Sequence, residues 1–260
     1  MLKSSEIDKE KIIFLLGGYD LEMCTIKELL CEQGVRYFDA GLRWDNARLS
    51  VYAPVLEQYG NSPDWTICGV ELEADVPKPR KYKVIDHHNE NSDKSSALEQ
   101  VAEILRVPLD RYRQLVAAND KGYIPGMLAM GATDEEIRSI RLADRRAQGV
   151  TPEDEYLAEK AITENLKREG DLTVVRALNS RFSPICDRLY PYRALLVYTS
   201  TEWMFYGMGA HWALSLFGDE LRKGKIFYGG GIDGYVGSKK HIYTEEEIYK
   251  IIKMIENEFV

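Results

Sequence analysis

Lys83-Val84-Ile85-Asp86-His87-His88-Asn89 is the stretch of this sequence that indicates its fold most directly. Residues 83–85 have the character of a strand, and they lead straight into one carboxylate and two adjacent imidazoles. In an open α/β sheet, ligands bind at the carboxyl ends of the strands, which is where this cluster would lie. The chain has 4 histidines, and because two of them are adjacent here, a metal or catalytic role is favoured over an ordinary surface loop.

Strand-like and helix-like segments alternate around this stretch. Apolar runs predict strands over 11–16, 35–38, 65–70 and 83–85, and apolar residues at helical spacing predict helices over 21–33, 47–59, 96–106 and 109–119. Thr133 and Glu136 have the pattern of a capping box that begins a further helix. This order predicts an α/β protein whose N-terminal domain contains a parallel sheet with helices on both faces.

The pattern restarts after Gly170. Strands are expected over 172–178, 194–199 and 225–228, and helices over 210–217 and from Thr244 onward. A charged helix that begins at Thr151 and ends near residue 168 lies between the two patterns. We therefore predict an N-terminal domain over 1–150, a connector helix over 151–169 and a smaller α/β C-terminal domain over 170–260.

Composition and charge exclude several classes of protein. The chain is 45% hydrophobic and 29% charged, as is usual for soluble proteins, and no apolar run approaches a membrane span. The net charge of -8 argues against binding of extended duplex nucleic acid. The cysteines lack CxxC spacing and lie in apolar contexts, which indicates buried free thiols and a cytoplasmic location. They are Cys24, Cys31, Cys68 and Cys186.

The segment 84–89 resembles the signature of the DHH phosphoesterase superfamily, and the resemblance extends over nearly the whole chain. That group includes family II inorganic pyrophosphatases, single-strand-specific exonucleases, nano-RNases and cyclic-dinucleotide phosphodiesterases. Its first motif falls here at 16–22, with Asp20 and Glu22 as the carboxylates. Its second motif falls at Glu71, with Glu73 as a less favoured substitute, and its fourth at Asp120.

Two departures from the family pattern concern histidines. Leu16 stands where the first motif has a histidine, and Ile232 stands where the family's glycine-rich GGGH segment has another. The resemblance implies that one metal ion is held by four residues, and that a second ion would retain only Asp20 and Glu71. The four residues are Glu22, Glu71, His87 and Asp120. We therefore expect one sound Mn2+ site, with Mg2+ as the alternative ion, and a second site that is weak or absent. Asp39 and Asp45 stay open as replacement carboxylates.

The resemblance also implies roles toward the substrate. His88 would face the phosphate, and Asp86 would orient the histidines. The C-terminal domain would bind the substrate through backbone amides of a glycine cluster and through arginines. These residues are Gly229, Gly230, Gly231, Arg176, Arg181 and Arg193. The aromatic stretch 203–206 could stack a base, but its alternating spacing favours a place in the core.

Two functions are consistent with these residues. The first is a metal-dependent phosphoesterase or phosphodiesterase that acts on a small phosphorylated substrate, a nucleotide or a short oligonucleotide. The alternative is a catalytically impaired DHH-like protein that binds a phosphorylated ligand or a protein partner. Asp86, His87, His88 and Asp120 favour the first, whereas Leu16 and Ile232 favour the second. A homodimer stays open.

Overall fold

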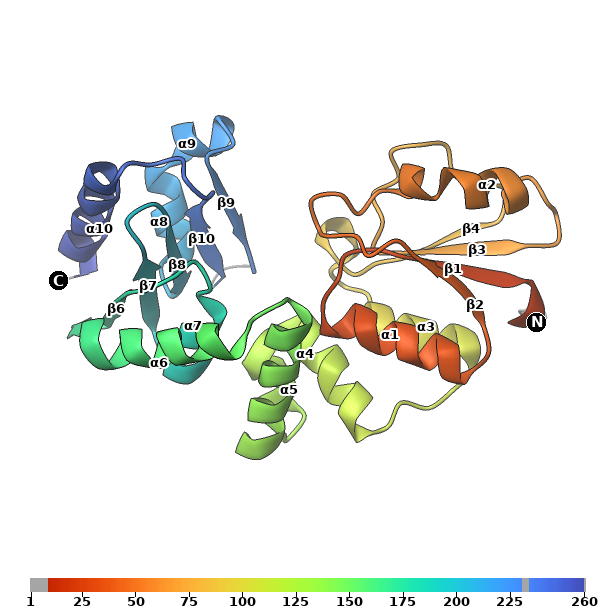
Figure 1. Cartoon of the computed structure of the whole chain (residues 1–260), viewed down its shortest axis with the longest axis horizontal. Helices are drawn as coiled ribbons and strands as arrows, with labels where there is room; N and C mark the ends of the chain where they lie inside the picture. The colour runs from red at the N-terminus through yellow and green to blue at the C-terminus, as the bar shows by residue number, and fades with distance from the viewer. Residues whose placement is uncertain (1–8, 231–233, 260) are drawn as a thin grey trace. The chain divides into compact units, whose positions relative to one another are not determined.

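The computed structural model describes residues 9–230 and 234–259. The chain divides into two compact units, residues 1–149 and 150–260 (Figure 1). Within the described residues, the first unit is built on a four-stranded sheet and the second on a six-stranded sheet. No helix of the described part is long and apolar enough to cross a membrane.

The sheet of the first unit is entirely parallel, as predicted. It has the order β2-β1-β3-β4. The strands are β1 (Ile12–Leu16), β2 (Arg36–Asp39), β3 (Thr66–Val70) and β4 (Tyr82–Ile85). Every residue of β1 is buried, because a central strand of a parallel sheet is covered on both faces.

Helices cover both faces of this sheet. Figure 1 shows α2 on one side and α1 and α3 on the other. The elements are the short 3-10 helices η1 (Lys9–Lys11), η2 (Leu49–Tyr52) and η3 (Asn89–Asn91), and the α-helices α1 (Leu21–Glu32), α2 (Ala53–Tyr59), α3 (Ala97–Leu105), α4 (Arg111–Ala129) and α5 (Asp134–Ala147). The predicted capping box at the start of α5 is confirmed: Glu136 N donates to Thr133 Oγ1, and Thr133 N donates to Glu136 Oε2.

A kink in α4 fixes the position of Asp120. The helix was expected to end near residue 119, but it continues to Ala129 after non-helical backbone at Gly122 and at Tyr123, whose φ is 53°. Arg141 of α5 holds this kink. Its Nη1 donates to Asn119 Oδ1 at 2.9 Å and to Asp144 Oδ2 at 2.6 Å, and its guanidinium lies 4.6 Å from the centroid of the Tyr123 ring.

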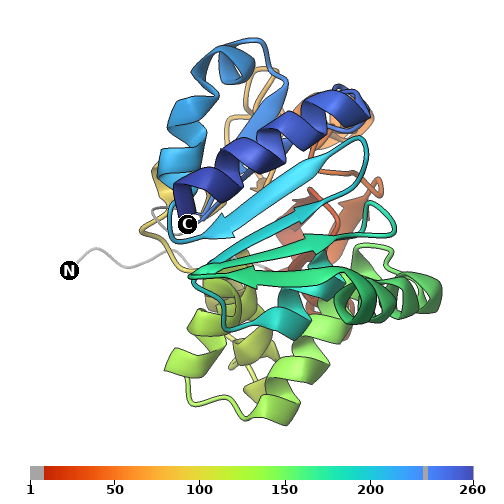
Figure 2. The same ribbon diagram turned by 90° about the vertical axis from the view of Figure 1, so that its left-hand side faces the viewer.

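The second unit has the strand order β5-β6-β7-β8-β10-β9, and only β6 and β7 pair in parallel. Its strands are β5 (Leu166–Glu169), β6 (Leu172–Arg176), β7 (Ala194–Tyr198), β8 (Trp203–Gly207), β9 (Ile226–Gly229) and β10 (Tyr235–Ser238). Its helices are α6 (Pro152–Asn165), α7 (Ser183–Leu189), α8 (Ala210–Leu216), α9 (Gly218–Arg222) and α10 (Glu245–Phe259). One apolar cluster joins the sheet to α6 and α7, and another joins it to α8 and α10 (Figure 2).

The helix expected over 151–169 is shorter than predicted. It ends at Asn165, and residues 166–169 form β5, which pairs antiparallel with β6. The buried residues Ala158 and Ala161 pack α6 into the core of the second unit. This helix is therefore a structural part of that unit, because its apolar face needs the sheet to cover it.

Two side-chain expectations had different outcomes. Trp203 and Phe205 are fully buried, which confirms that the aromatic stretch belongs to the core. The four cysteines are free, but Cys31 is exposed and Cys24 is partly exposed, so the expectation that all four are buried was wrong. Cys31 lies in the last turn of α1, and its Sγ is 3.0 Å from Tyr37 Oη of β2.

We predict that Arg141→Ala destabilises the first unit by about 3–5 kcal/mol, because it leaves the buried Asp144 without its ion-pair partner. Urea unfolding monitored by circular dichroism would measure this loss. Arg138→Ala is the matched control: it removes an exposed arginine of the same helix, and its effect should stay within about 0.5 kcal/mol. Equal unfolding midpoints for the two variants would show that the Arg141 contacts do not stabilise the kink.

Candidate metal centre

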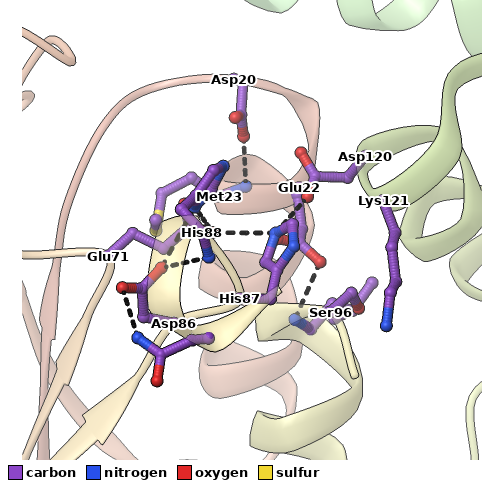
Figure 3. Close-up of polar contacts among 12 residues, drawn as sticks. Asp20, Glu22, Met23, Glu71, Asp86, His87, His88, Ser96, Asp120 and Lys121 are labelled. Atoms are coloured by element: carbon purple, nitrogen blue, oxygen red, sulfur yellow. Dashed lines mark hydrogen bonds and ion pairs between the residues drawn. The ribbon is translucent and has the colours of Figure 1, made fainter. Parts of the chain in front are cut away.

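Four side chains from different elements meet at the carboxyl edge of the first sheet (Figure 3). Glu71 follows β3, His87 follows β4, Glu22 lies in the first turn of α1, and Asp120 lies on α4 just before the kink. One ligand atom from each lies within 4.8 Å of the others. The sequence placed these four residues in one metal site, and the structure brings them together.

His87 is the centre of this group. Its Nε2 lies 2.6 Å from Asp120 Oδ2, 3.3 Å from Glu71 Oε1 and 3.8 Å from Glu22 Oε2. These atoms are buried, and none of them has a hydrogen-bond partner of good geometry among the described residues. Buried polar atoms in folded proteins almost always have a partner. Four unsatisfied donor atoms that converge on one point therefore fit the first coordination shell of a cation.

The electrostatics of the group also fit a cation. Burial, followed by the charges of Asp120 and Glu71, raises the pKa of Glu22 well above its usual range. Burial likewise raises the pKa of Glu71, despite its contact with His87. Burial opposes the charge of His87, but the adjacent Asp120 and Glu71 carboxylates outweigh it and raise the pKa of His87 to about 10. Without a metal ion, the group therefore holds protons that balance its negative charge.

The donor set suits a hard or borderline divalent cation. Carboxylates suit Mg2+ and Mn2+, whereas imidazole adds affinity for transition metals such as Mn2+ or Zn2+. No cysteine belongs to either group of described residues that could hold a metal ion. The residues present therefore fit the metal type that the sequence predicted.

The backbone positions these ligands with some strain. Glu71 has a φ of 51°, which is unusual for a residue other than glycine, and its amide donates to Ile85 O at 2.8 Å. Gly17 crosses directly over this turn, since a Cβ added there would lie 2.3 Å from Glu71 O. Glu22 is held by its Oε1, which accepts from Leu98 N at 3.0 Å and leaves Oε2 toward His87. Strained backbone of this kind is typical of functional sites.

His88 lies beside this group but in a different environment. Its side chain is 42% exposed, and its Nδ1 lies 3.1 Å from Asp86 Oδ1. The backbone amide of His88 donates to the same Asp86 oxygen at 2.9 Å, and Asn91 Nδ2 donates to Asp86 Oδ2 at 3.1 Å. Although burial opposes it, these hydrogen bonds and the charge of His88 lower the pKa of Asp86. An ionised Asp86 only accepts, so Nδ1 of His88 is the donor of this pair.

A second group of possible ligands consists of Glu71, His87 and His88. The sequence had assigned His88 to the phosphate and had not predicted that it lies close enough to share a cation with Glu71. Its Nδ1 is 3.6 Å from Glu71 Oε1. Only the tertiary structure shows this second grouping, because the backbone directions at Glu71 and His88 decide it.

Asp20 and Leu16 do not contribute to either group. Asp20 Oδ1 accepts from Met23 N at 2.8 Å, so this carboxylate caps the start of α1. Burial and the nearby charges of Asp120 and Glu71 raise the pKa of Asp20 well above its usual range. Leu16 is fully buried at the end of β1. The structure therefore places a helix cap and an apolar side chain where the family pattern would have two ligands.

The replacement carboxylates considered from the sequence are used elsewhere. Asp39 accepts from Lys27 Nζ at 2.7 Å and from Gly41 N at 2.8 Å. The side chain of Glu73 is 68% exposed and pairs with Arg48, and Asp45 is exposed. None of these carboxylates belongs to a possible metal group of the described chain.

The structure does not gather the three arginines of the second unit at one point. Arg176 ends β6 and pairs with Glu245, whereas Arg193 precedes β7 and pairs with Asp171. Since β6 and β7 are parallel, Arg176 and Arg193 lie at opposite ends of this strand pair. They therefore cannot bind the same phosphate. Arg181 lies between β6 and α7. Substrate binding by any one of these arginines stays a prediction.

The glycine cluster has a local structural explanation. Gly230 has a φ of 80°, and a Cβ added at Gly234 would lie 1.9 Å from Gly229 O. The chain therefore needs glycine where it turns and crosses itself here. Gly231 and Ile232 lie outside the described residues. Binding of a substrate by Gly229, Gly230 and Gly231 stays a prediction.

The sequence analysis missed one aromatic residue at the site. The rings of Trp44 and His88 are in edge contact, with centroids 5.3 Å apart. A Cβ added at Gly18 would lie 2.6 Å from Trp44 Cδ2, so the indole covers this glycine. A lone tryptophan in the polar stretch 41–48 was the available signal, but the sequence does not show that this loop reaches residue 88.

Comparison with known proteins gives a likeness in structure only. No family model and no curated protein matches the sequence. A solved structure described as the DHH domain of PF0399, a member of a family of ribosomal proteins, has a TM-score of 0.53 and 12% identity, covering 96% of this chain and 86% of that chain. At this identity, the likeness concerns the fold.

Two further solved structures have lower TM-scores. The pGpG-specific phosphodiesterase PggH from Vibrio cholerae has a TM-score of 0.46 and 13% identity, covering 97% of this chain and 99% of that chain. RecJ from Thermus thermophilus, in complex with Mn2+, has a TM-score of 0.47 and 11% identity, covering 96% of this chain and 52% of that chain. The fold assignment rests on the PF0399 domain and on the parallel sheet whose edge carries Asp86, His87 and His88. The fold of this chain is therefore similar to that of the PF0399 DHH domain.

Proposed function

We propose that this chain is a metal-dependent phosphoesterase that cleaves a phosphodiester bond in a small nucleotide or a short oligonucleotide. The observation that carries the proposal is the buried group of Glu22, Glu71, His87 and Asp120, whose donor atoms converge without hydrogen-bond partners. An exposed histidine, His88, lies directly beside it. Buried metal ligands next to an accessible proton donor are the components that phosphoester hydrolysis requires.

These four residues would hold a divalent cation, with Mn2+ favoured and Mg2+ as the alternative. When bound, such an ion lowers the pKa of a coordinated water and neutralises charge on the phosphoryl oxygens. Glu22 contributes one oxygen to this task while its other oxygen stabilises the start of α3. Glu71 has both oxygens unsatisfied and lies close to both histidines, which supports a bridging position if two ions bind.

His88 and Asp86 act on the substrate side. Because Nδ1 of His88 donates to Asp86, Nε2 is the ring nitrogen that remains for an oxygen of the phosphate. Asp86 fixes the orientation of the ring through its contact with Nδ1. A protonated His88 would then stabilise the negative charge that develops on the phosphoryl group in the transition state.

The catalytically impaired alternative keeps specific support. Leu16 is fully buried, one oxygen of Asp20 caps α1, and the second group of possible ligands among the described residues consists of Glu71 and the two histidines. A protein with this site could bind a phosphorylated ligand through one ion without turning it over. Four free cysteines support a reducing, cytoplasmic compartment under either function, and a homodimer stays a prediction.

We predict that the purified protein binds Mn2+ and that His87→Ala weakens this binding by at least about 10–100-fold, the usual cost of losing even an outer-shell partner of a ligand. Metal titration followed by calorimetry would measure it. His88→Ala should reduce the rate of hydrolysis by a larger factor than it reduces the affinity for Mn2+. Hydrolysis should be tested on pGpG, short oligonucleotides, cyclic dinucleotides, pyrophosphate and bis-p-nitrophenyl phosphate.

His211→Ala is the control for this experiment, because it removes an exposed histidine from the second unit. It should bind Mn2+ as the wild type does. Equal metal content in the wild type and His87→Ala would show that the buried group is not the metal site. A wild type that binds Mn2+ but hydrolyses none of the substrates would favour the impaired alternative.

We predict that the affinity for Mn2+ rises with pH. His87 carries a proton up to its pKa of about 10 in the metal-free protein, and an imidazole must lose this proton to become a ligand. Below that pKa the proton competes with the metal, so affinity should increase about tenfold per pH unit for each proton displaced. Calorimetric titrations at several pH values, in buffers of different ionisation enthalpy, would count the protons. Affinity that does not change with pH would contradict the proton-bound state of the group.

We predict that Leu16→His increases the affinity for a second Mn2+ ion and raises phosphodiesterase activity, because it restores the nitrogen ligand of the family pattern. Leu15→His is the control. Leu15 packs in the apolar cluster beneath α2, on the other face of β1, so a histidine there should lower stability without adding a metal site.

Three results of this comparison are informative. A second ion bound by Leu16→His alone supports the impaired alternative for the wild type. Two ions bound tightly by the wild type, together with turnover, would show that other residues replace the missing histidine. Failure of both proteins to bind a second ion would show that the first motif does not align at residues 16–22.

A further inference from the structure

Trp44 occupies an unusual position for an exposed tryptophan. The residue has a relative exposure of 50%. One face of the indole covers Gly18, where a Cβ would come within 2.6–2.9 Å of the ring atoms. The ring also makes an edge contact with His88, at a centroid distance of 5.3 Å and an interplanar angle of 66°. Since Gly18 covers one face, the accessible surface lies on the other face and along the edge.

The loop that carries Trp44 is anchored on both sides. On one side, Tyr52 Oη donates to Leu16 O at 2.5 Å and accepts from Ala40 N at 3.1 Å. On the other, Glu73 N donates to Ala47 O at 2.9 Å. The flanking residues Leu42 and Ala47 are buried in the apolar cluster of this unit. The indole is therefore held in place before any ligand arrives, which reduces the entropy lost on binding.

The neighbouring groups define what could cover the open face. His88 is the residue proposed to face the phosphate, so a molecule bound there has its phosphate within a few ångströms of the indole. A nucleoside phosphate has an aromatic base at a comparable separation from its phosphate, and bases stack on tryptophan without regard to their identity. Pyrophosphate and other purely inorganic phosphates would leave the open face exposed to water.

We propose that Trp44 is a stacking platform for the base of a nucleotide whose phosphate lies at His88. The inference rests on the proposed function, and it assigns to Trp44 the recognition of the base of the nucleotide substrate. Gly18 is part of this stacking platform, because any larger residue would displace the indole from its place beside His88. The platform recognises a base as an aromatic plane and does not by itself select one base over another.

The test uses the full chain with Mn2+ and compares AMP with ribose 5-phosphate, which has the same phosphate and sugar without the base. We expect AMP to bind about tenfold more tightly and to quench tryptophan fluorescence. Trp44→Leu should remove this preference and leave the affinity for ribose 5-phosphate unchanged. Trp44→Phe should keep part of it, since phenylalanine retains an aromatic face.

Trp65→Phe is the matched control. Trp65 precedes β3, at the edge of the sheet opposite Glu71, and it contacts Tyr59 and Arg36. This variant should retain both the AMP preference and the quenching. The inference would be overturned if wild type bound AMP and ribose 5-phosphate equally, if AMP did not bind, or if Trp44→Leu weakened both ligands equally. The last result would mean that Trp44 only supports His88.

Failure of the stacking proposal can be distinguished from failure of the proposed enzymatic function. Absence of hydrolysis on every phosphodiester, with a retained tenfold preference for AMP, would remove the enzymatic function and leave the stacking platform. Hydrolysis that is unaffected by Trp44→Leu on nucleotide substrates, with equal binding of AMP and ribose 5-phosphate, would leave the enzyme and remove the platform.

Discussion

The approach of two buried carboxylates and one partly buried carboxylate to one imidazole is the constraint on which the first unit depends. Glu22, Glu71 and Asp120 repel one another, and burial removes the water that would screen them. His87 offsets part of this repulsion, since its nitrogen lies within 4 Å of an oxygen of each carboxylate. Such a group costs folding free energy unless a cation or protons balance it. The composition and geometry of this group therefore fit a site that could hold a cation.

Contacts with the surrounding structure hold the ligands in this energetically unfavourable arrangement. Glu22 reaches the group because its other oxygen accepts from an amide at the start of α3. Asp120 reaches it because α4 breaks at Gly122 and Tyr123, and Arg141 holds that break through Asn119 and the Tyr123 ring. The left-handed backbone at Glu71 and the close crossing of Gly17 complete the turn beside β3. Local strain near two of the four ligands, Glu71 and Asp120, is balanced by packing elsewhere in the unit.

The two adjacent histidines divide the site into an inner and an outer part. His87 points into the buried group, whereas His88 is partly exposed and is oriented by Asp86. The two rings lie side by side, with centroids 4.3 Å apart, so a single Asp-His-His sequence can serve both parts. Trp44 and Gly18 border the outer part. In our proposals, the inner part binds the metal, and the outer part binds the phosphate and the attached base.

The sequence by itself determined the parallel sheet and the position of the signature at its edge, and its resemblance to the DHH phosphoesterases implied the four residues of the group around His87. Strand periodicity, capping boxes and the Asp86-His87-His88 signature are local or recur at fixed positions along the chain, so they can be read without coordinates. Only the tertiary structure decided that Asp20 caps a helix, that residues 166–169 form a strand, that Arg176 and Arg193 lie apart, and that Trp44 meets His88. The physical reason is that these outcomes depend on side-chain directions, on kinks and on contacts between segments that are distant in sequence. A single backbone angle, such as the φ of Glu71, decides whether a carboxylate faces the group or the solvent.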